Sequence, residues 1–372
     1  MIVVRKILKL VTPLLLICSF AIFAFATNIT SDTSITDSYV TKDNLIVYNS
    51  ADNYDIKELN AFLENGGIII ADSLSNVNVA SNIDMSISTD NINDVTGEIA
   101  TLGKDIATLY YKYGDNFDGI YVINVGINDV VDENTLIQEA VNIIRERQSI
   151  FEYATENSVA ATTATSQAVQ TLGIFDATYS REPKGKLRVS YEVFTLQNYN
   201  NLDFYIIKSK ISGIPGCVLA ETNSAYKSKY QIKELILSLD ADSNSTTLDD
   251  FGPQRTVHSS TYTVDFGGQL DDTGTISING GWSYSKTIED TEIDVTFTTK
   301  LVEWDLTLTA GAQETSCIFY PAATYKCPST KSSIQISANA SCIFDSWDTL
   351  KETVSLNRNI TITPSNASAQ PE

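Results

Sequence analysis

Histidine and positive charge are scarce in this chain of 372 residues. It has one histidine, and its 25 Lys and Arg residues stand against 46 Asp and Glu residues, for a formal net charge of −21. Such an acidic protein is repelled by nucleic-acid phosphates and by anionic lipid surfaces. We therefore expect no nucleic-acid partner, and any membrane contact must rest on apolar burial or on a neutral head-group receptor.

The usual signatures of catalysis and cofactor binding are missing as well. No G-x-G-x-x-G follows a predicted strand, and no G-x-x-x-x-G-K-[ST] occurs. Asp72 ends a predicted strand, and Asp129, Asp132 and Glu133 follow another, which we interpret as capping and solvation of loop ends. We expect no enzyme, no cofactor and no metal. An enzyme with an acidic pocket near Asp72 and Asp129 is the last-ranked alternative.

The first 26 residues have the pattern of a secretory signal. Three basic residues (Arg5, Lys6 and Lys9) precede an apolar run that ends in Ala-Phe-Ala at residues 24–26. The alternative is a retained membrane anchor, because the run with its flanks approaches spanning length. We predict cleavage after Ala26 and a secreted, extracellular protein.

Cysteine is also rare, with five residues in the chain. Cleavage after Ala26 would remove Cys18 and leave four, and an even number in an exported protein favours disulfide bonds, with three possible connectivities. We expect Cys317 and Cys327 to form a local pair, because Tyr320-Pro321 can turn the chain between them. A zinc site is less favoured, because there is no C-x-x-C. The disulfide candidates are Cys217, Cys317, Cys327 and Cys342.

Residues 42–150 alternate strand and helix patterns. Apolar runs at 44–48 and 67–71 are typical of buried parallel strands, and Ile56, Leu59 and Phe62 predict a helix between them. A strand at 119–125 and a helix at 133–147 complete a small N-terminal α/β layer domain. A further amphipathic helix is predicted from the spacing of Ile99, Leu102, Ile106, Leu109, Tyr110 and Tyr113.

The composition changes after this domain. Residues 151–186 are rich in Ala, Thr and Ser, and we interpret them as a linker. From residue 187 to 364, short β-type runs are separated by Gly, Pro, Asn and Asp, which predicts a mainly-β domain with a β-sandwich.

Residues 257–290 predict an unusual amphipathic hairpin within the β domain. Two alternating arms flank the turn Asp271, Asp272, Thr273 and Gly274, and each apolar row covers nine residues (262–270 and 276–284). The opposite rows are small, polar and nearly uncharged. The apolar rows consist of Tyr262, Val264, Phe266 and Leu270 on the first arm, and Ile276, Ile278, Trp282 and Tyr284 on the second.

Two interpretations fit this alternation. On periodicity alone a sandwich strand is commoner, but its outward face usually carries Lys, Glu and Arg. The length of each row approaches the roughly 9–11 residues that cross a bilayer as a tilted strand, and a small polar face suits the inside of a water-filled barrel. A lone hairpin cannot insert, because its unpaired backbone groups cost several kcal/mol each in lipid.

The hairpin and its flanks resemble a known toxin family. The turn followed by Ile276, then GGWSYSKTI (280–288) and TTKLVEWDL (298–306), is similar to the stem of the leukocidin/hemolysin family of bacterial β-barrel pore-forming toxins. The segment VSYEVF to KISGIPG (189–216) is similar to the strands of the family's cap. The resemblance covers about Leu187 to Leu306, a third of the chain.

This resemblance implies a soluble protein that assembles into a ring on a target membrane, with itself or with a related second component. It would then insert the stem rows named above into lipid to form a transmembrane β-barrel. Trp304 matches a tryptophan of the cap core, which implies a packing role.

The chain departs from the family in two places. A shorter, cysteine-bearing segment (315–342) replaces the family's rim, and the N-terminal α/β domain is additional. Receptor and oligomer number therefore do not carry over. A secreted or cell-surface β-sandwich that binds or adheres without making a pore remains the alternative.

Overall fold

The computed structural model describes residues 40–41, 45–48, 55–72, 79–80, 83–91, 103–113, 117–157, 170–199, 201–254, 260–265, 283–288, 292–309, 312–346 and 349–363. All of them belong to one compact unit, Ser38–Glu372. The predicted signal segment, 1–26, lies outside the described residues. Within the described part, no helix is both long and apolar enough to span a membrane.

Strands dominate the unit. The elements are β1 (Val40–Thr41), β2 (Leu45–Tyr48), α2 (Ile56–Glu64), β3 (Ile68–Asp72), β4 (Ile87–Asn91), β5 (Gly103–Tyr113), β6 (Phe117–Gly126), α4 (Glu133–Asn157), β7 (Gln170–Arg181), β8 (Gly185–Tyr199), β9 (Leu202–Pro215), α5 (Gly216–Leu219), β10 (Tyr230–Ala241), β11 (Thr247–Gly252), β12 (Ser260–Asp265), β13 (Ser283–Ile288), β14 (Glu292–Phe297), β15 (Leu301–Thr307), β16 (Cys317–Phe319), β17 (Ala322–Pro328), β18 (Ile334–Ser346) and β19 (Thr349–Ile362).

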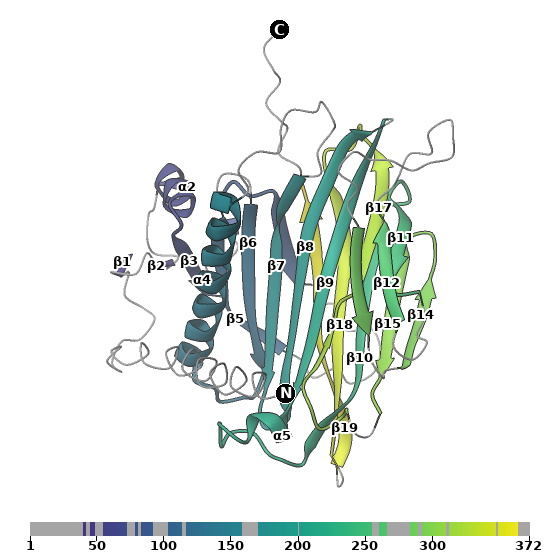
Figure 1. Ribbon diagram of the computed structural model, residues 1–372. Coiled ribbons are helices and arrows are strands. Elements are labelled where there is room, and N and C mark those ends of the chain that lie inside the picture. The colour runs from purple at the N-terminus through teal and green to yellow at the C-terminus, as the bar shows by residue number, and fades with distance from the viewer. Residues whose placement is uncertain are drawn as a thin grey trace, which may run out of the picture. The chain divides into compact units, whose positions relative to one another are not determined.

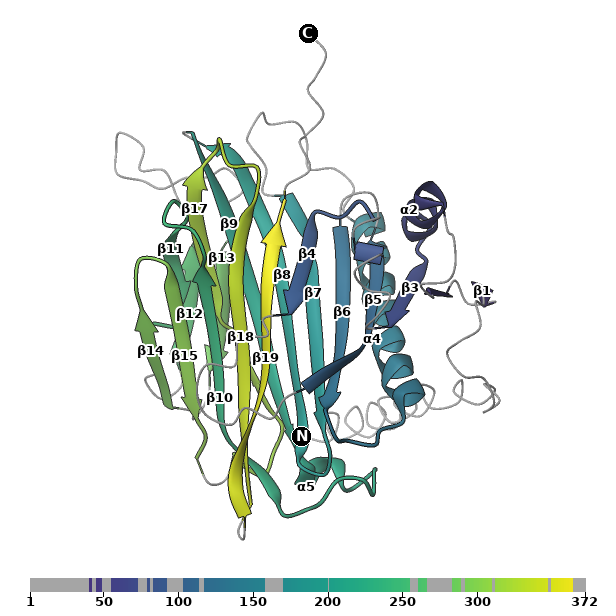
Figure 2. The same cartoon turned by 180° about the vertical axis from the view of Figure 1, so that it is seen from behind.

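Two sheets are stacked to form a sandwich (Figures 1 and 2). The large sheet has the order β1-β2-β3-β5-β6-β7-β8-β9-β17-β11, with β16 also paired to β9. The small sheet has the order β14-β15-β10-β18-β19-β4. Strands β12 and β13 form a third, two-stranded sheet of their own. The predicted mainly-β architecture of residues 187–364 agrees with these sheets.

Alternating side chains of the strands fill two large apolar cores, and Leu196, Phe204 and Ile206 form a third, small cluster. The main core holds inward-facing residues of both sheets, among them Tyr191, Leu237 and the fully buried Trp304. A second core lies between the large sheet and α4, where Ala140 and Ile144 pack on β5 and β6. Figure 1 shows α4 along this face, and Figure 2 shows β4 and β19 on the opposite one.

The predicted helix through Ile99 to Tyr113 is wrong. Residues 103–113 form β5, which pairs antiparallel with both β3 and β6. Leu109 and Tyr111 enter the α4 core while Tyr110 enters the main core, so both faces of the strand are buried. A strand buried on both faces lacks a polar face, and its apolar run also satisfies helical spacing.

The strands and helix predicted around residues 44–71 are confirmed as elements. Strands β2 and β3 pair in parallel, and α2 connects them. The side chain of Asp55 accepts a hydrogen bond from the Lys57 amide (2.9 Å) and starts α2. The helix ends at Asn65, where Gly66 takes a φ of +78°.

The segment predicted as a linker contains ordered structure. Helix α4 extends to Asn157, and residues 170–181 form β7, which pairs with β6 on one side and β8 on the other. The N-terminal strands thus continue into the sheet of the sandwich. Backbone pairing between neighbours outweighs the polar composition of this segment.

All four described cysteines, Cys217, Cys317, Cys327 and Cys342, are free thiols in the structure. The predicted Cys317–Cys327 pair is wrong, because the strand register holds these two residues far apart. Cys317 pairs with Gly213 of β9 and Cys327 with Asp203. Ten residues of an extended strand separate these partners, a distance of about 33 Å. A disulfide needs Cα atoms within roughly 7 Å.

Candidate membrane-inserting hairpin

The described part of the hairpin is a regular antiparallel ribbon. Strands β12 and β13 pair from Ser260↔Ile288 to Asp265↔Ser283 without a bulge. Val264 is opposite Tyr284, and Thr263 is opposite Ser285. Residues directly opposite each other share one face of an antiparallel pair. At these two positions, the register therefore places an apolar residue opposite an apolar one and a small polar residue opposite another small polar one. Closer to the base of the hairpin this match is lost, because the charged Lys286 is opposite Tyr262.

The hairpin connects the outer strands of two different sheets. Strand β11, which precedes it, is the last strand of the large sheet, and β14, which follows it, is the first strand of the small sheet. Among the described residues, neither β12 nor β13 is paired with a strand of these sheets. Moving β12 and β13 would therefore break none of the backbone ladders that the structure describes in the sandwich.

An aromatic cluster fixes the base of the hairpin. The ring of Phe251 in β11 lies 4.9 Å from that of Phe297 in β14 and 6.4 Å from that of Trp304 in β15. The Trp304 indole donates a hydrogen bond to the Pro253 carbonyl (2.8 Å). The expected packing role of Trp304 is confirmed. Phe251 and Trp304 are buried, whereas Phe297 is 61% exposed. The first arm of the hairpin therefore starts next to a buried aromatic contact.

Most predicted stem residues lie outside the described part of the chain. Tyr262 and Val264 are in β12, and Tyr284 is in β13. The remaining stem and turn residues are not described: Phe266, Leu270, Asp271, Asp272, Thr273, Gly274, Ile276, Ile278 and Trp282.

The acidic residues of the enzyme alternative have structural partners. Asp129 forms an ion pair with Arg181, which also binds Glu352 (2.6 Å). Asp132 caps α4, because its carboxylate accepts hydrogen bonds from the Thr135 amide (3.3 Å) and hydroxyl (2.7 Å). These hydrogen bonds lower the pKa of Asp132. The arrangement matches the predicted capping role.

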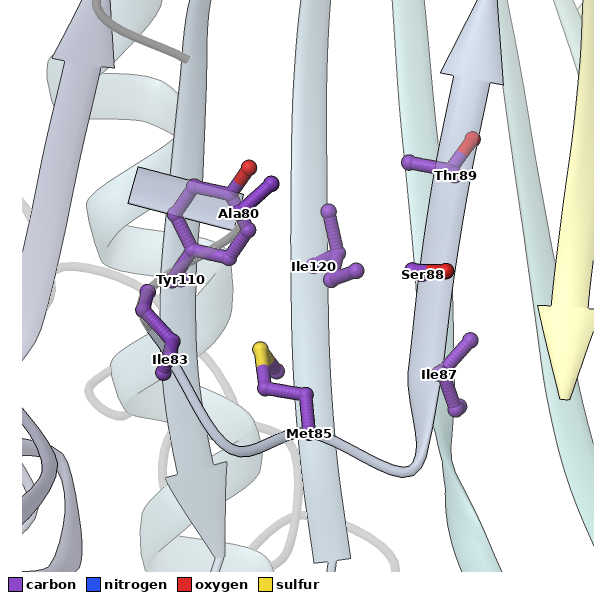
Figure 3. Close-up of a pocket in the computed structure, with 8 residues that line it drawn as sticks. All are labelled: Ala80, Ile83, Met85, Ile87, Ser88, Thr89, Tyr110 and Ile120. Atoms are coloured by element: carbon purple, nitrogen blue, oxygen red, sulfur yellow. The ribbon is translucent and has the colours of Figure 1, made fainter. Parts of the chain in front are cut away.

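A small hollow of about 30 Å³ lies between β4, β5 and β6 (Figure 3). Neither Asp72 nor Asp129 lines it. The Thr89 hydroxyl is buried there without a hydrogen-bond partner. The hollow offers packing surface and no carboxylate. Its lining consists of Ala80, Ile83, Met85, Ile87, Ser88, Thr89, Tyr110 and Ile120.

Acidic side chains converge on the small sheet next to the hairpin, a feature that the sequence reasoning missed. Asp294 of β14 is directly opposite Asp305 of β15. Burial, followed by the carboxylates of Glu234, Asp294 and Glu303, raises the pKa of Asp305 to about 7. The acidic residues that alternate along these two segments were visible in the sequence. That the two strands pair with each other, which brings the carboxylates together, was not.

No protein-family model and no curated protein sequence matches the chain. Among solved structures, the chain is similar to Clostridium perfringens delta-toxin (10% identity, 55% of this chain and 96% of that one, TM-score 0.33). It is also similar to a pore-forming protein (10% identity, 50% of this chain and 88% of that one, TM-score 0.29). A third similar structure is the Clostridium perfringens NetB toxin in its membrane-inserted form (7% identity, 51% of this chain and 96% of that one, TM-score 0.27).

Proposed function

We propose that the protein is a secreted pore-forming cytolysin that assembles into a ring and inserts its hairpin into a target membrane. The predicted signal at residues 1–26 supports export, with cleavage after Ala26. The observation that most strongly supports insertion is that β12 and β13 form a two-stranded sheet of their own. Along the chain, this sheet is flanked by β11 and β14, the outer strands of the two larger sheets. The mechanism is assembly and insertion, not catalysis.

The driving force is the transfer of the apolar rows into lipid. Each buried Å² of apolar surface contributes roughly 25 cal/mol. Single hairpins are excluded from lipid by their unpaired backbone groups, so several copies must close into one barrel. The rows placed in lipid are Tyr262, Val264, Phe266 and Leu270, and Ile276, Ile278, Trp282 and Tyr284, with the turn 271–274 at the far end.

Residues 187–364 supply the cap from which the stem departs. The aromatic cluster of Phe251, Phe297 and Trp304 would hold the cap's end of the stem in place during the movement. The partners are further copies of this chain, or a related second component, and a neutral membrane lipid or receptor. A neutral surface is favoured by the net charge of −21.

Dye release tests the proposal. The protein is added to phosphatidylcholine–cholesterol vesicles loaded with calcein, and the products are run on a gel in SDS without boiling. Leakage together with SDS-resistant rings supports the pore. Intact vesicles and a persistent monomer would favour the alternative of a secreted or cell-surface binding protein.

A further inference from the structure

A half-buried cysteine, Cys317, and a buried one, Cys342, come from strands of opposite sheets. Cys317 belongs to β16 of the large sheet, where it pairs with Gly213 of β9. Cys342 belongs to β18 of the small sheet and is fully buried between Leu235 and Val354 of the neighbouring strands. Cys317 packs against the same core as Cys342.

Gly213 shows how close the two sheets come at this point. A Cβ atom on Gly213 would lie 3.3 Å from the Cys342 Sγ and only 2.8 Å from the Ile232 side chain. Because Gly213 lacks a side chain, residues of the small sheet fill its place. Residues directly opposite each other place their Cβ atoms on one face, about 4.5–5.5 Å apart. The Cys317 side chain therefore points to the face of β9 on which the Cys342 sulfur packs against Gly213.

The electrostatics of the two thiols support their proximity. Burial raises the pKa of Cys342 well above its usual value, and the nearby Cys317 raises it further. Burial also raises the pKa of Cys317 to about 11. Such thiols form little thiolate at neutral pH, so oxidation is favoured while the chain is folding and both sulfurs still meet solvent.

The other two cysteines are in different surroundings. Cys327 pairs with Asp203, ten residues along β9 from Gly213, or about 33 Å. Cys217, in α5, donates a hydrogen bond to the Glu314 carbonyl (3.4 Å). The register therefore separates Cys327 from both Cys317 and Cys342, which leaves Cys317–Cys342 as the bridge that the packing of the two sheets favours.

We propose that Cys317 and Cys342 form a disulfide that joins the two sheets of the exported protein. The bond rests on the export part of the proposed function, because it needs an oxidising compartment. Glutathione disulfide is a sufficient oxidant: the two thiols lose two protons and two electrons, one S–S bond forms, and two molecules of glutathione are released.

Refolding tests the bond without any membrane. The full chain carrying Cys18→Ser is denatured, reduced, and refolded in a buffer of reduced and oxidised glutathione. Free thiols are then alkylated under denaturing conditions, and the protein is digested and analysed by mass spectrometry. We expect one linked peptide pair containing Cys317 and Cys342, with Cys217 and Cys327 alkylated.

Melting temperatures provide a second readout. Cys317→Ser, Cys342→Ser and the double variant should each melt about 5 °C below the oxidised parent, and reduction of the parent should give the same loss. Cys217→Ser should keep the full sensitivity to reductant. Four alkylated cysteines, or a bridge to Cys217 or Cys327, would overturn the proposal. Both of these outcomes are measured without vesicles, so failure of the disulfide and failure of the pore are distinguishable.

Discussion

The chain contains two long hairpins that look alike in sequence and are built into the fold differently. Strands β18 and β19 carry a small polar outward face, with Ser341 bonded to Ser355 (2.8 Å) and Ser337 to Asn359 (2.8 Å). The hairpin around β12 and β13 has the same kind of face. However, β18–β19 is paired with β10 on one side and β4 on the other, while β12–β13 is paired with neither large nor small sheet.

This difference shows that composition alone does not identify a membrane stem. A small, uncharged polar face also occurs on a hairpin fixed in the sandwich. What distinguishes the stem is its position between two outer strands. The two hairpins therefore serve as each other's control in the experiments below.

The largest effect is expected from a charge on the apolar row of the stem. Ile278→Asp should abolish calcein release, because a charge on a lipid-facing strand costs roughly 2–4 kcal/mol per copy and the ring repeats it. The matched control is Ser277→Asp on the opposite face, which should retain most of the leakage. Circular dichroism should show both variants folded. Leakage that survives Ile278→Asp would contradict the stem assignment.

A buried ion pair attaches the fixed hairpin to the N-terminal strands. Arg358 in β19 binds both carboxylate oxygens of Asp105 (2.6 and 3.0 Å) and the side chain of Asn124 (2.9 Å). Arg358→Met leaves Asp105 without this partner and should lower the free energy of unfolding by about 3 kcal/mol. Calorimetry should show a single unfolding transition whose melting temperature is lower in the variant. Separate melting of the N-terminal strands would show that they are not integrated with the sandwich.

Truncation of one isoleucine in each hairpin compares their contributions to stability. Ile336 in β18 is fully buried, so Ile336→Ala should cost about 2–4 kcal/mol in urea unfolding. Under the proposed function Ile278 meets lipid and not the sandwich core, so Ile278→Ala should change the value by less than about 0.5 kcal/mol. Equal losses would place the stem in the core.

The smallest effect concerns the acidic residues beside the hairpin. The pKa of Asp305 is raised to about 7, so the folded protein binds this proton more tightly than the unfolded chain. Stability should therefore rise as the pH falls from about 7 towards 4. Asp305→Asn should raise the melting temperature above pH 7 and not near pH 4, by the equivalent of less than about 1 kcal/mol, since solvent screens the carboxylates. Asp242→Asn, at an exposed position, is the control; a pH dependence that Asp305→Asn leaves unchanged would refute the assignment.

The sequence predicted local elements better than their connections. The continuous apolar runs of β3 and β6 and the capped helices α2 and α4 were recognisable, because burial and capping leave local signals. Strand β5 was mistaken for a helix, since burial on both faces removes the alternation. Strand β7 was hidden in a polar segment whose pairing partners are distant in sequence.

The candidate site was predictable in part. The alternation from Tyr262 to Tyr284 and the burial of Trp304 were visible in the residues. The position of β11 and β14 at the outer edges of two sheets depends on long-range strand order, which no local pattern encodes. The same limit applies to the cysteines, because the local turn at Tyr320-Pro321 suggested a pair that the register separates.

Scanning the second arm with an environment-sensitive fluorophore tests the central claim most directly. Single cysteines replace Thr275, Ile276, Ser277, Ile278 and Asn279 in turn, each is labelled, and emission is recorded before and after adding phosphatidylcholine–cholesterol vesicles, with the unsubstituted chain as the blank. The account predicts a blue shift at 276 and 278 only, the period-two pattern of a strand with one face in lipid. An unchanged spectrum at all five positions, or a shift without alternation, would contradict it.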